Sequence, residues 1–133
     1  MRISYSLDEN ISGLVRDIVD DLSLDYIDLD RVVCVRSRGS KSRYTIARCH
    51  GLPRIWQKAL GEKPTYIIEV ISERYDKLSD DEKAKTLLHE VLHIPRGFSG
   101  GFRSHFRFVD RKTVDRAFAD LQRIRALRKA MPR

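Results

Sequence analysis

The stretch "LLHEVLHIPRGFSGGFRSHF", residues 87–106, decides how this chain is interpreted, because it holds three of the four histidines. His89 and His93 are four residues apart, so on a helix both imidazoles lie on one face and can bind one ion. Glu90 follows His89 directly and can reach a water on that ion. This is the HExxH pattern, which combines neutral imidazole ligands for Zn²⁺ with a carboxylate that serves as general base.

The neighbouring residues favour a metal site over a core helix that merely contains histidines. Five apolar residues around the pattern already supply a core-facing surface: Leu87, Leu88, Val91, Leu92 and Ile94. Burying His89, Glu90 and His93 among them costs free energy unless their polar atoms are satisfied. One metal ion satisfies all three, and it is therefore the better explanation of the pattern.

A catalytic zinc needs a third protein ligand and an open position. The pattern HExxHxxGxxH is excluded, since Arg96 and Ser99 stand where its glycine and third histidine would be. A downstream glutamate is excluded too, because no Glu follows Glu90. His105 remains, beyond the pair Gly100-Gly101, which permits a tight return of the chain. An aspartate is the alternative ligand: Asp110, Asp115 or Asp120.

Length and composition suggest one domain, residues 1–133, with a modest core. The chain has 41% hydrophobic and 34% charged residues, as expected for a soluble globular protein. It shows no apolar run long enough to span a membrane and no signal-peptide pattern at its start, so we expect no membrane partner and a cytoplasmic location. Cys34 and Cys49 form no disulfide framework, and a zinc site with His50 lacks the usual CxxC spacing.

Hydrophobic periodicity and capping signals predict the secondary structure. A capping box from Ser6 to Glu9 predicts a helix over 7–22, and a second box from Ser79 to Glu82 predicts a helix over 80–93. The turn "RGSKS" predicts a hairpin of strands 31–37 and 43–49. The remaining elements are a short helix at 53–60, a strand at 64–71, a loop at 95–108 and a long basic helix at 110–131. This order gives a small α+β domain with a short antiparallel or mixed sheet.

The net charge of +7 is concentrated in two parts of the chain. Residues 31–60 contain eight basic residues and no acidic one, and residues 96–133 contain eleven basic and three acidic residues. Such blocks are typical of proteins with a polyanionic partner, so segments 31–58 and 96–133 are candidates for nucleic-acid binding. A solvated surface balanced by the acidic N-terminal part is the alternative. Tyr44 and Trp56 could stack on bases, although Trp56 is expected in the core.

The segment "HEVLHIPRGFSGGFRSH" resembles a phage and archaeal zinc metallopeptidase family, whose pattern is approximately HELLHIP, then FSGG, then an Arg and a His. More distantly, the chain is similar to SprT-like zincins. The close resemblance covers roughly residues 79–118, and Phe102 and Phe106 depart from it in the loop. It implies a zincin-like fold, with His89, His93 and His105 as zinc ligands and Glu90 as the base.

The function that follows is peptide-bond hydrolysis by a zinc-activated water, with Glu90 as general base and a peptide or protein as substrate. Four residues are candidates for oxyanion or substrate contacts: Tyr66, Tyr75, Arg103 and Ser104. Glu69 and Asp110 are candidates for holding the histidine rings. The strand 64–71 is a possible sheet edge on which an extended peptide could pair.

Two alternatives belong to other classes. One is a nucleic-acid-associated basic module with a structural or vestigial metal site. The other is a metal-independent interaction protein of the toxin–antitoxin type. Metal analysis tests the site: near-stoichiometric zinc that is lost in His89→Ala, with Glu90 intact, supports the peptidase, whereas a metal-independent protein or a vestigial site takes up no zinc.

Overall fold

The fold is organised around β4 (Tyr66–Ile71), the most apolar strand of the sheet. The computed structural model describes residues 2–101 and 109–132. Its four-stranded sheet has the order β1-β2-β4-β3, with β1 at Ser4–Leu7, β2 at Val32–Arg38 and β3 at Ala47–Gly51. β2 pairs with β4 in parallel. β1 pairs antiparallel with β2, and β3 pairs antiparallel with β4. The predicted α+β class with a mixed sheet is confirmed.

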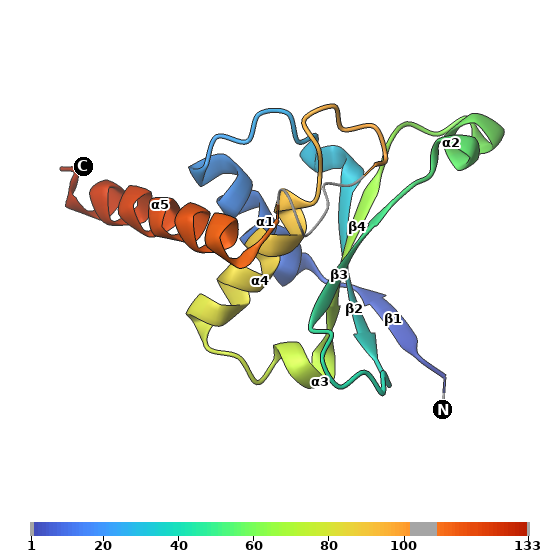
Figure 1. Ribbon diagram of the computed structural model, residues 1–133, viewed down its shortest axis with the longest axis horizontal. Helices are drawn as coiled ribbons and strands as arrows, with labels where there is room; N and C mark the ends of the chain where they lie inside the picture. Colours follow the sequence, from blue (N-terminus) through green and yellow to red (C-terminus); the bar gives the residue numbers. More distant parts are fainter. Residues whose placement is uncertain (1, 102–108, 133) are drawn as a thin grey trace.

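Helices cover one face of this sheet (Figure 1). α1 (Glu9–Asp21), α4 (Asp80–Leu92) and α5 (Arg111–Ala130) pack against one another there, while α2 (Arg54–Leu60) projects beyond the end of the sheet and α3 (Ser72–Tyr75) follows β4 directly. The core between helices and sheet contains Tyr66, Ile68 and Val70 of β4 together with Leu87, Leu88 and Val91 of α4. The arrangement is consistent with a small zincin-like domain.

The predicted hairpin of strands 31–37 and 43–49 is wrong, because β4 lies between β2 and β3. Four of the six residues of β4 are fully buried, and a strand of this kind gains most from neighbours on both sides. The prediction that strand 64–71 forms an edge is wrong for the same reason. Among the strands that the structure describes, β1 and β3 are the edges.

The N-terminal helix begins later than predicted. Residues Ser4–Leu7 form β1, and Asp8, rather than Ser6, caps α1 by accepting a hydrogen bond from the backbone N–H of Ile11 at 2.9 Å. The predicted capping box at Ser79 is confirmed, since Ser79 and Glu82 satisfy each other's backbone N–H groups at the start of α4. Trp56 was expected in the core but is 55% exposed.

Candidate metal centre

α4 carries the HExxH pattern into the interior at its C-terminal end. The capping box and the acidic first turn stabilise its start. Leu87, Leu88 and Val91 then bury one side of the helix in the core. Glu90 and His93 are only 7% and 6% exposed, so their polar atoms lie in a largely dry environment. Such burial is costly unless these groups have a common partner.

The three residues meet at one point. One ligand atom each of His89, Glu90 and His93 lies within 4.8 Å of the others, and the two imidazole rings stand 5.0 Å apart at 69°. Two atoms bound to the same zinc at about 2 Å each lie at most about 4 Å apart, so small side-chain rotations bring the nitrogens of His89 and His93 into range, with Glu90 beside them. Nitrogen donors from two imidazoles are also the donor type that zinc prefers. The residues therefore fit a metal ion.

The carboxyl group of Glu90 has an unusual proton affinity. Burial disfavours its charged form and raises its pKa from 4.5 to about 7. A carboxyl with a pKa near neutrality can both accept and return a proton, which is the property that a general base in hydrolysis requires.

Cys49 of β3 lies near this carboxyl group but keeps its proton. Burial, and then the charge of Glu90, raise the pKa of the Cys49 thiol to about 12. His50, the next residue, points to the opposite face of the sheet. There its Nε2 lies 2.8 Å from Glu69 Oε1. The conceivable zinc site of Cys34, Cys49 and His50 is therefore not formed, and the described residues contain one cluster that could hold a metal, namely His89, Glu90 and His93.

A cavity of about 440 Å³ opens onto His89 and Glu90. One wall is the segment that leads into β3, and the others come from α4 and the first turns of α5. The lining residues are Tyr44, Thr45, Ile46, Ala47, Lys85, Thr86, Arg111, Val114 and Asp115. Lys85 and Asp115 form an ion pair of 3.5 Å across the gap between the two helices. Space for a substrate thus lies directly in front of the polar cluster.

The loop that follows α4 is fixed to the sheet by Tyr66. The Tyr66 hydroxyl donates to the carbonyl of Gly101 and accepts from the N–H of Gly100, both at 2.8 Å. A Cβ on Gly51 would lie 2.4 Å from the carbonyl oxygen of Gly100, so this approach requires a glycine in β3. Gln57 of α2 adds hydrogen bonds from Nε2 to the carbonyls of Leu52 at 2.8 Å and Ser99 at 2.9 Å. The hydrogen bonds of Tyr66 and Gln57 therefore hold the loop from Ser99 to Gly101 against the end of β3.

The residues predicted for oxyanion or substrate contacts have different positions. Tyr66 is fully buried and holds the loop, and Tyr75 is 1% exposed beneath Arg36 and Lys83. These surroundings give neither hydroxyl a path to a substrate. Arg103, Ser104 and His105 lie outside the described residues.

The two candidates for orienting the histidines have other roles. Burial opposes ionisation of Glu69, but hydrogen bonds from Ser37 and His50 hold its pKa below the usual range. Asp110 caps α5 by accepting from the N–H of Thr113 at 2.8 Å. Gln57 and Gly51, which secure the loop, were not singled out in the sequence, because their contacts join residues 42 and 49 positions apart.

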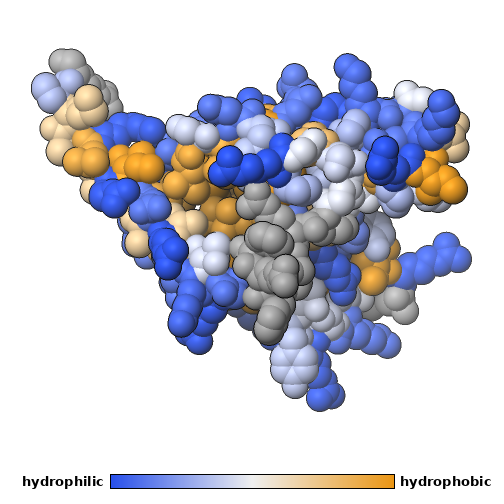
Figure 2. Space-filling model, turned by 45° about the horizontal axis from the view of Figure 1, so that its top comes forward, coloured by the Kyte–Doolittle hydropathy of each residue, from blue (hydrophilic) through white to orange (hydrophobic). Residues whose placement is uncertain are grey.

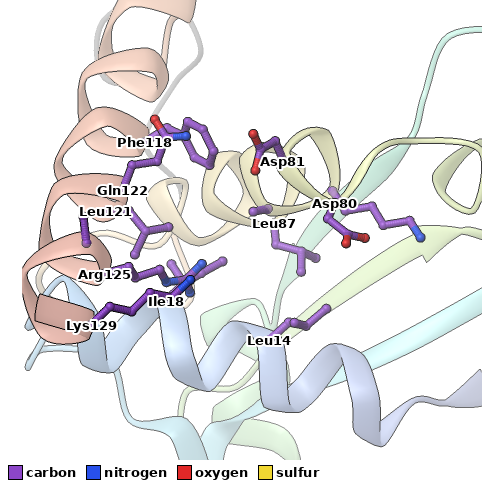
Figure 3. Close-up of a pocket in the computed structure, with 13 residues that line it drawn as sticks. Leu14, Ile18, Asp80, Asp81, Leu87, Phe118, Leu121, Gln122, Arg125 and Lys129 are labelled. Atoms are coloured by element: carbon purple, nitrogen blue, oxygen red, sulfur yellow. The ribbon is translucent and has the colours of Figure 1, made fainter.

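A second, larger cavity of about 580 Å³ lies on the other flank of α4 (Figure 3). Its floor is formed by Leu14 and Ile18 of α1, Leu87 of α4, and Phe118 and Leu121 of α5. None of the three polar residues of the metal centre lines it. Its larger size does not make it an active site. The candidate active site is the cavity of about 440 Å³, which His89 and Glu90 line.

The fold and the polar cluster define the class: a small zincin-like α+β domain with a candidate metal centre on its central helix. A family model described as "Putative phage metallopeptidase" matches residues 3–122, and the chain belongs to this family. Membership supports a peptidase function, a metal ion and a peptide or protein substrate. No curated protein and no solved structure matches the chain. Within the described part of the chain, no helix is both long enough and apolar enough to cross a membrane.

Proposed function

We propose that this protein is a zinc-dependent peptidase of the HExxH type, with His89, His93 and His105 as zinc ligands and Glu90 as general base. The observation that carries the proposal is the convergence of His89, Glu90 and His93 within 4.8 Å at a cavity of about 440 Å³.

Glu90 supplies the proton transfers. Its carboxylate accepts the proton of the attacking water and returns it to the amine that leaves when the peptide bond breaks. Burial supports both steps, because a pKa of about 7 lets the same group lose and gain a proton near neutral pH. When bound, zinc supplies a Lewis acid that polarises the scissile carbonyl and makes water more acidic.

The outer edge of β3 is the better candidate for binding an extended substrate. β3 ends the sheet, so the backbone groups on its outer side have no strand partner among the described residues. Cys49, at its centre, lies close enough to Glu90 to feel its charge, and the metal-site cavity begins at Ala47. A peptide paired with this edge by β-addition would pass the catalytic carboxylate.

Nucleic-acid binding by segments 31–58 and 96–133 stays a prediction, and the ion pairs argue against it as the main function. In the first segment Arg31, Arg36 and Arg48 pair with carboxylates. In the second, Arg125 and Arg128 both pair with Asp21. A part of the positive charge in each segment is thus neutralised within the fold. A steep loss of DNA affinity with added salt would support the nucleic-acid alternative.

Metal analysis and activity of single variants test the proposal. We expect about one zinc per purified chain, lost in His89→Ala and in His105→Ala. His50→Ala is the matched control, because His50 binds Glu69 on the opposite face and its loss should leave zinc unchanged. Glu90→Gln should keep zinc and lose at least about a hundredfold in hydrolysis of a denatured protein substrate. A parent protein that takes up no zinc contradicts the proposal. Retention of zinc in His105→Ala would point to an aspartate as third ligand.

A further inference from the structure

α2 exposes apolar side chains that the fold does not use. Ile55, Trp56 and Leu60 are 76%, 55% and 61% exposed, and no residue of α2 is buried. The helix projects from the sheet at the end opposite to the tip of α5 (Figure 1). Figure 2 shows hydrophobic surface between hydrophilic side chains at both of these ends. Neighbouring apolar side chains presented in this way are typical of a binding site.

The exposed helix is held in a defined position. Pro53 precedes its first turn, and Gly61 ends it in the left-handed conformation at φ 67°. Gln57 ties its inner side to Leu52 and to the loop after α4 through bonds of 2.8 and 2.9 Å. A fixed helix presents its outer side chains without a large ordering cost on binding.

An apolar cavity of about 320 Å³ lies at the base of α2. Leu60 lines it together with Leu52 and with Ile67 of β4, and Gly51, at the end of β3, lies at its margin. The cavity has room for one large apolar side chain. Trp56 does not line it, but it is four residues before Leu60, which does, and so lies on the same side of α2.

The surroundings of this apolar surface are basic. Arg54, Lys58 and Lys63 form no ion pair with any residue that the structure describes. The one acidic residue at the cavity, Glu62, pairs with Arg31 at 3.1 Å. Charge complementarity therefore favours a partner that carries an apolar anchor flanked by acidic residues.

We propose that α2 and the cavity at its base form a docking site for an acidic polypeptide segment with an apolar anchor, carried by the protein that this peptidase cleaves. The inference rests on the proposed function. Gly51 joins the two sites, because it ends the free edge of β3 and also borders the cavity. An extended chain paired with β3 thus arrives at α2. A lipid surface fits less well, since a concave cavity accepts a side chain and α2 has only seven residues.

Trp56 is the only tryptophan in the chain, so its fluorescence reports directly on this site. The experiment uses the full-length Glu90→Gln protein, which keeps binding separate from hydrolysis. It is titrated with the peptide EDELFLEDE, and with EDESGSEDE and KKKLFLKKK as controls. We expect a saturable blue shift of the emission with the first peptide, and binding at least about tenfold weaker with the other two.

A pair of double variants identifies the surface. Ile55→Ser with Leu60→Ser should weaken EDELFLEDE at least about tenfold. Leu127→Ser with Met131→Ser is the matched control, because these side chains are similarly exposed, at 60% and 68%, on the distant end of α5. It should change affinity less than about twofold. The absence of a shift with EDELFLEDE, or equal affinities of the two double variants, overturns the proposal. So does a shift produced only by vesicles of three parts phosphatidylcholine to one part phosphatidylglycerol.

Hydrolysis by the zinc-loaded parent separates this inference from the peptidase proposal. A cleavable peptide extended with EDELFLEDE should have a KM at least about tenfold lower than the unextended peptide, with similar kcat, and the Ile55→Ser, Leu60→Ser protein should lose that advantage. If neither peptide is cleaved, the peptidase proposal fails, while the fluorescence titration still decides whether the docking site exists. If both are cleaved with equal KM, the docking site fails and the peptidase stands.

Discussion

Replacing Tyr66 with phenylalanine should destabilise the protein through one oxygen atom. The side chain is fully buried, and its hydroxyl makes two hydrogen bonds of 2.8 Å with Gly100 and Gly101. The ring, which packs 5.0 Å from that of Phe98, stays in place in the variant. Each lost bond costs about 0.5–1.5 kcal/mol, and more where the remaining partner stays dry. We therefore expect Tyr66→Phe to lower the free energy of unfolding by about 2 kcal/mol.

Tyr75→Phe makes the same chemical change with the opposite expectation. Tyr75 is 1% exposed, and its hydroxyl has no hydrogen-bond partner among the described residues. Removing an unsatisfied buried hydroxyl costs nothing and can be stabilising, while the cation contacts of Arg36 and Lys83 with the ring remain. We expect a free energy of unfolding within about 0.5 kcal/mol of the parent, or higher.

Urea denaturation followed by circular dichroism measures both variants under the same conditions. The slope of the free energy against urea should stay constant, so that the shift in midpoint reports stability alone. Zinc affinity provides a second measurement: Tyr66→Phe should weaken it more than Tyr75→Phe, because Tyr66 holds the loop that leads to position 105. Equal stabilities of the two variants, or a Tyr66→Phe protein as stable as the parent, would refute this account of the loop.

Three further predictions concern stability. Gly51→Ala places a Cβ 2.4 Å from a carbonyl oxygen of the loop after α4 and should lower the free energy of unfolding, measured by urea denaturation, by at least about 2 kcal/mol. Gly97→Ala has open space around it and should lower it by less than about 1 kcal/mol. Equal losses in the two variants would contradict the close approach at Gly51. Burial opposes ionisation of Asp8, but hydrogen bonds, including that from Arg36, hold its pKa in the folded protein below 3.8. The ionised Asp8 therefore stabilises the folded state fully above pH 3.8, and this stabilisation is lost as the pH falls through the pKa of the folded protein. The stability difference between parent and Arg36→Met should therefore shrink in acid, and a difference that grows would be inconsistent with this sign. Ser79→Ala removes the cap of α4 and should lower the free energy of unfolding by about 1 kcal/mol, and no change in the urea midpoint would count against the capping box.

Local sequence signals were sufficient for the elements that carry the candidate site. The capping box at Ser79 acts within three residues, and the spacing of His89 and His93 acts within one helical turn. In the structure, Ser79 and Glu82 cap the start of α4, and the rings of His89 and His93 lie 5.0 Å apart. Local signals also explain why the bounds of α2 were predicted accurately. The helix ends at Gly61 because glycine readily adopts the left-handed conformation that stops a helix.

Strand order could not be obtained in this way, because it depends on competition between distant segments. The turn "RGSKS" permits a hairpin, but β4 pairs with both β2 and β3 and displaces it. The contact of Gly51 with Gly100 likewise joins residues that no local pattern connects. Trp56 was misplaced because its apolar character predicts burial, whereas α2 lies outside the core.

The corrected strand order also changes where a substrate can bind. In the predicted hairpin, the segment that forms β3 would pair with β2, and the free edge would belong to residues 64–71. With β4 between β2 and β3, the edge strand beside α4, which carries Glu90, is Ala47–Gly51, and the described residues offer no strand partner on its outer side. Gly51 then connects this edge to the cavity beneath α2 and, through its contact with Gly100, to the loop after α4. One interior strand thereby makes β3 the link between the proposed cleavage site, whose cavity begins at Ala47, and the proposed docking site and the loop contact, which both lie at Gly51.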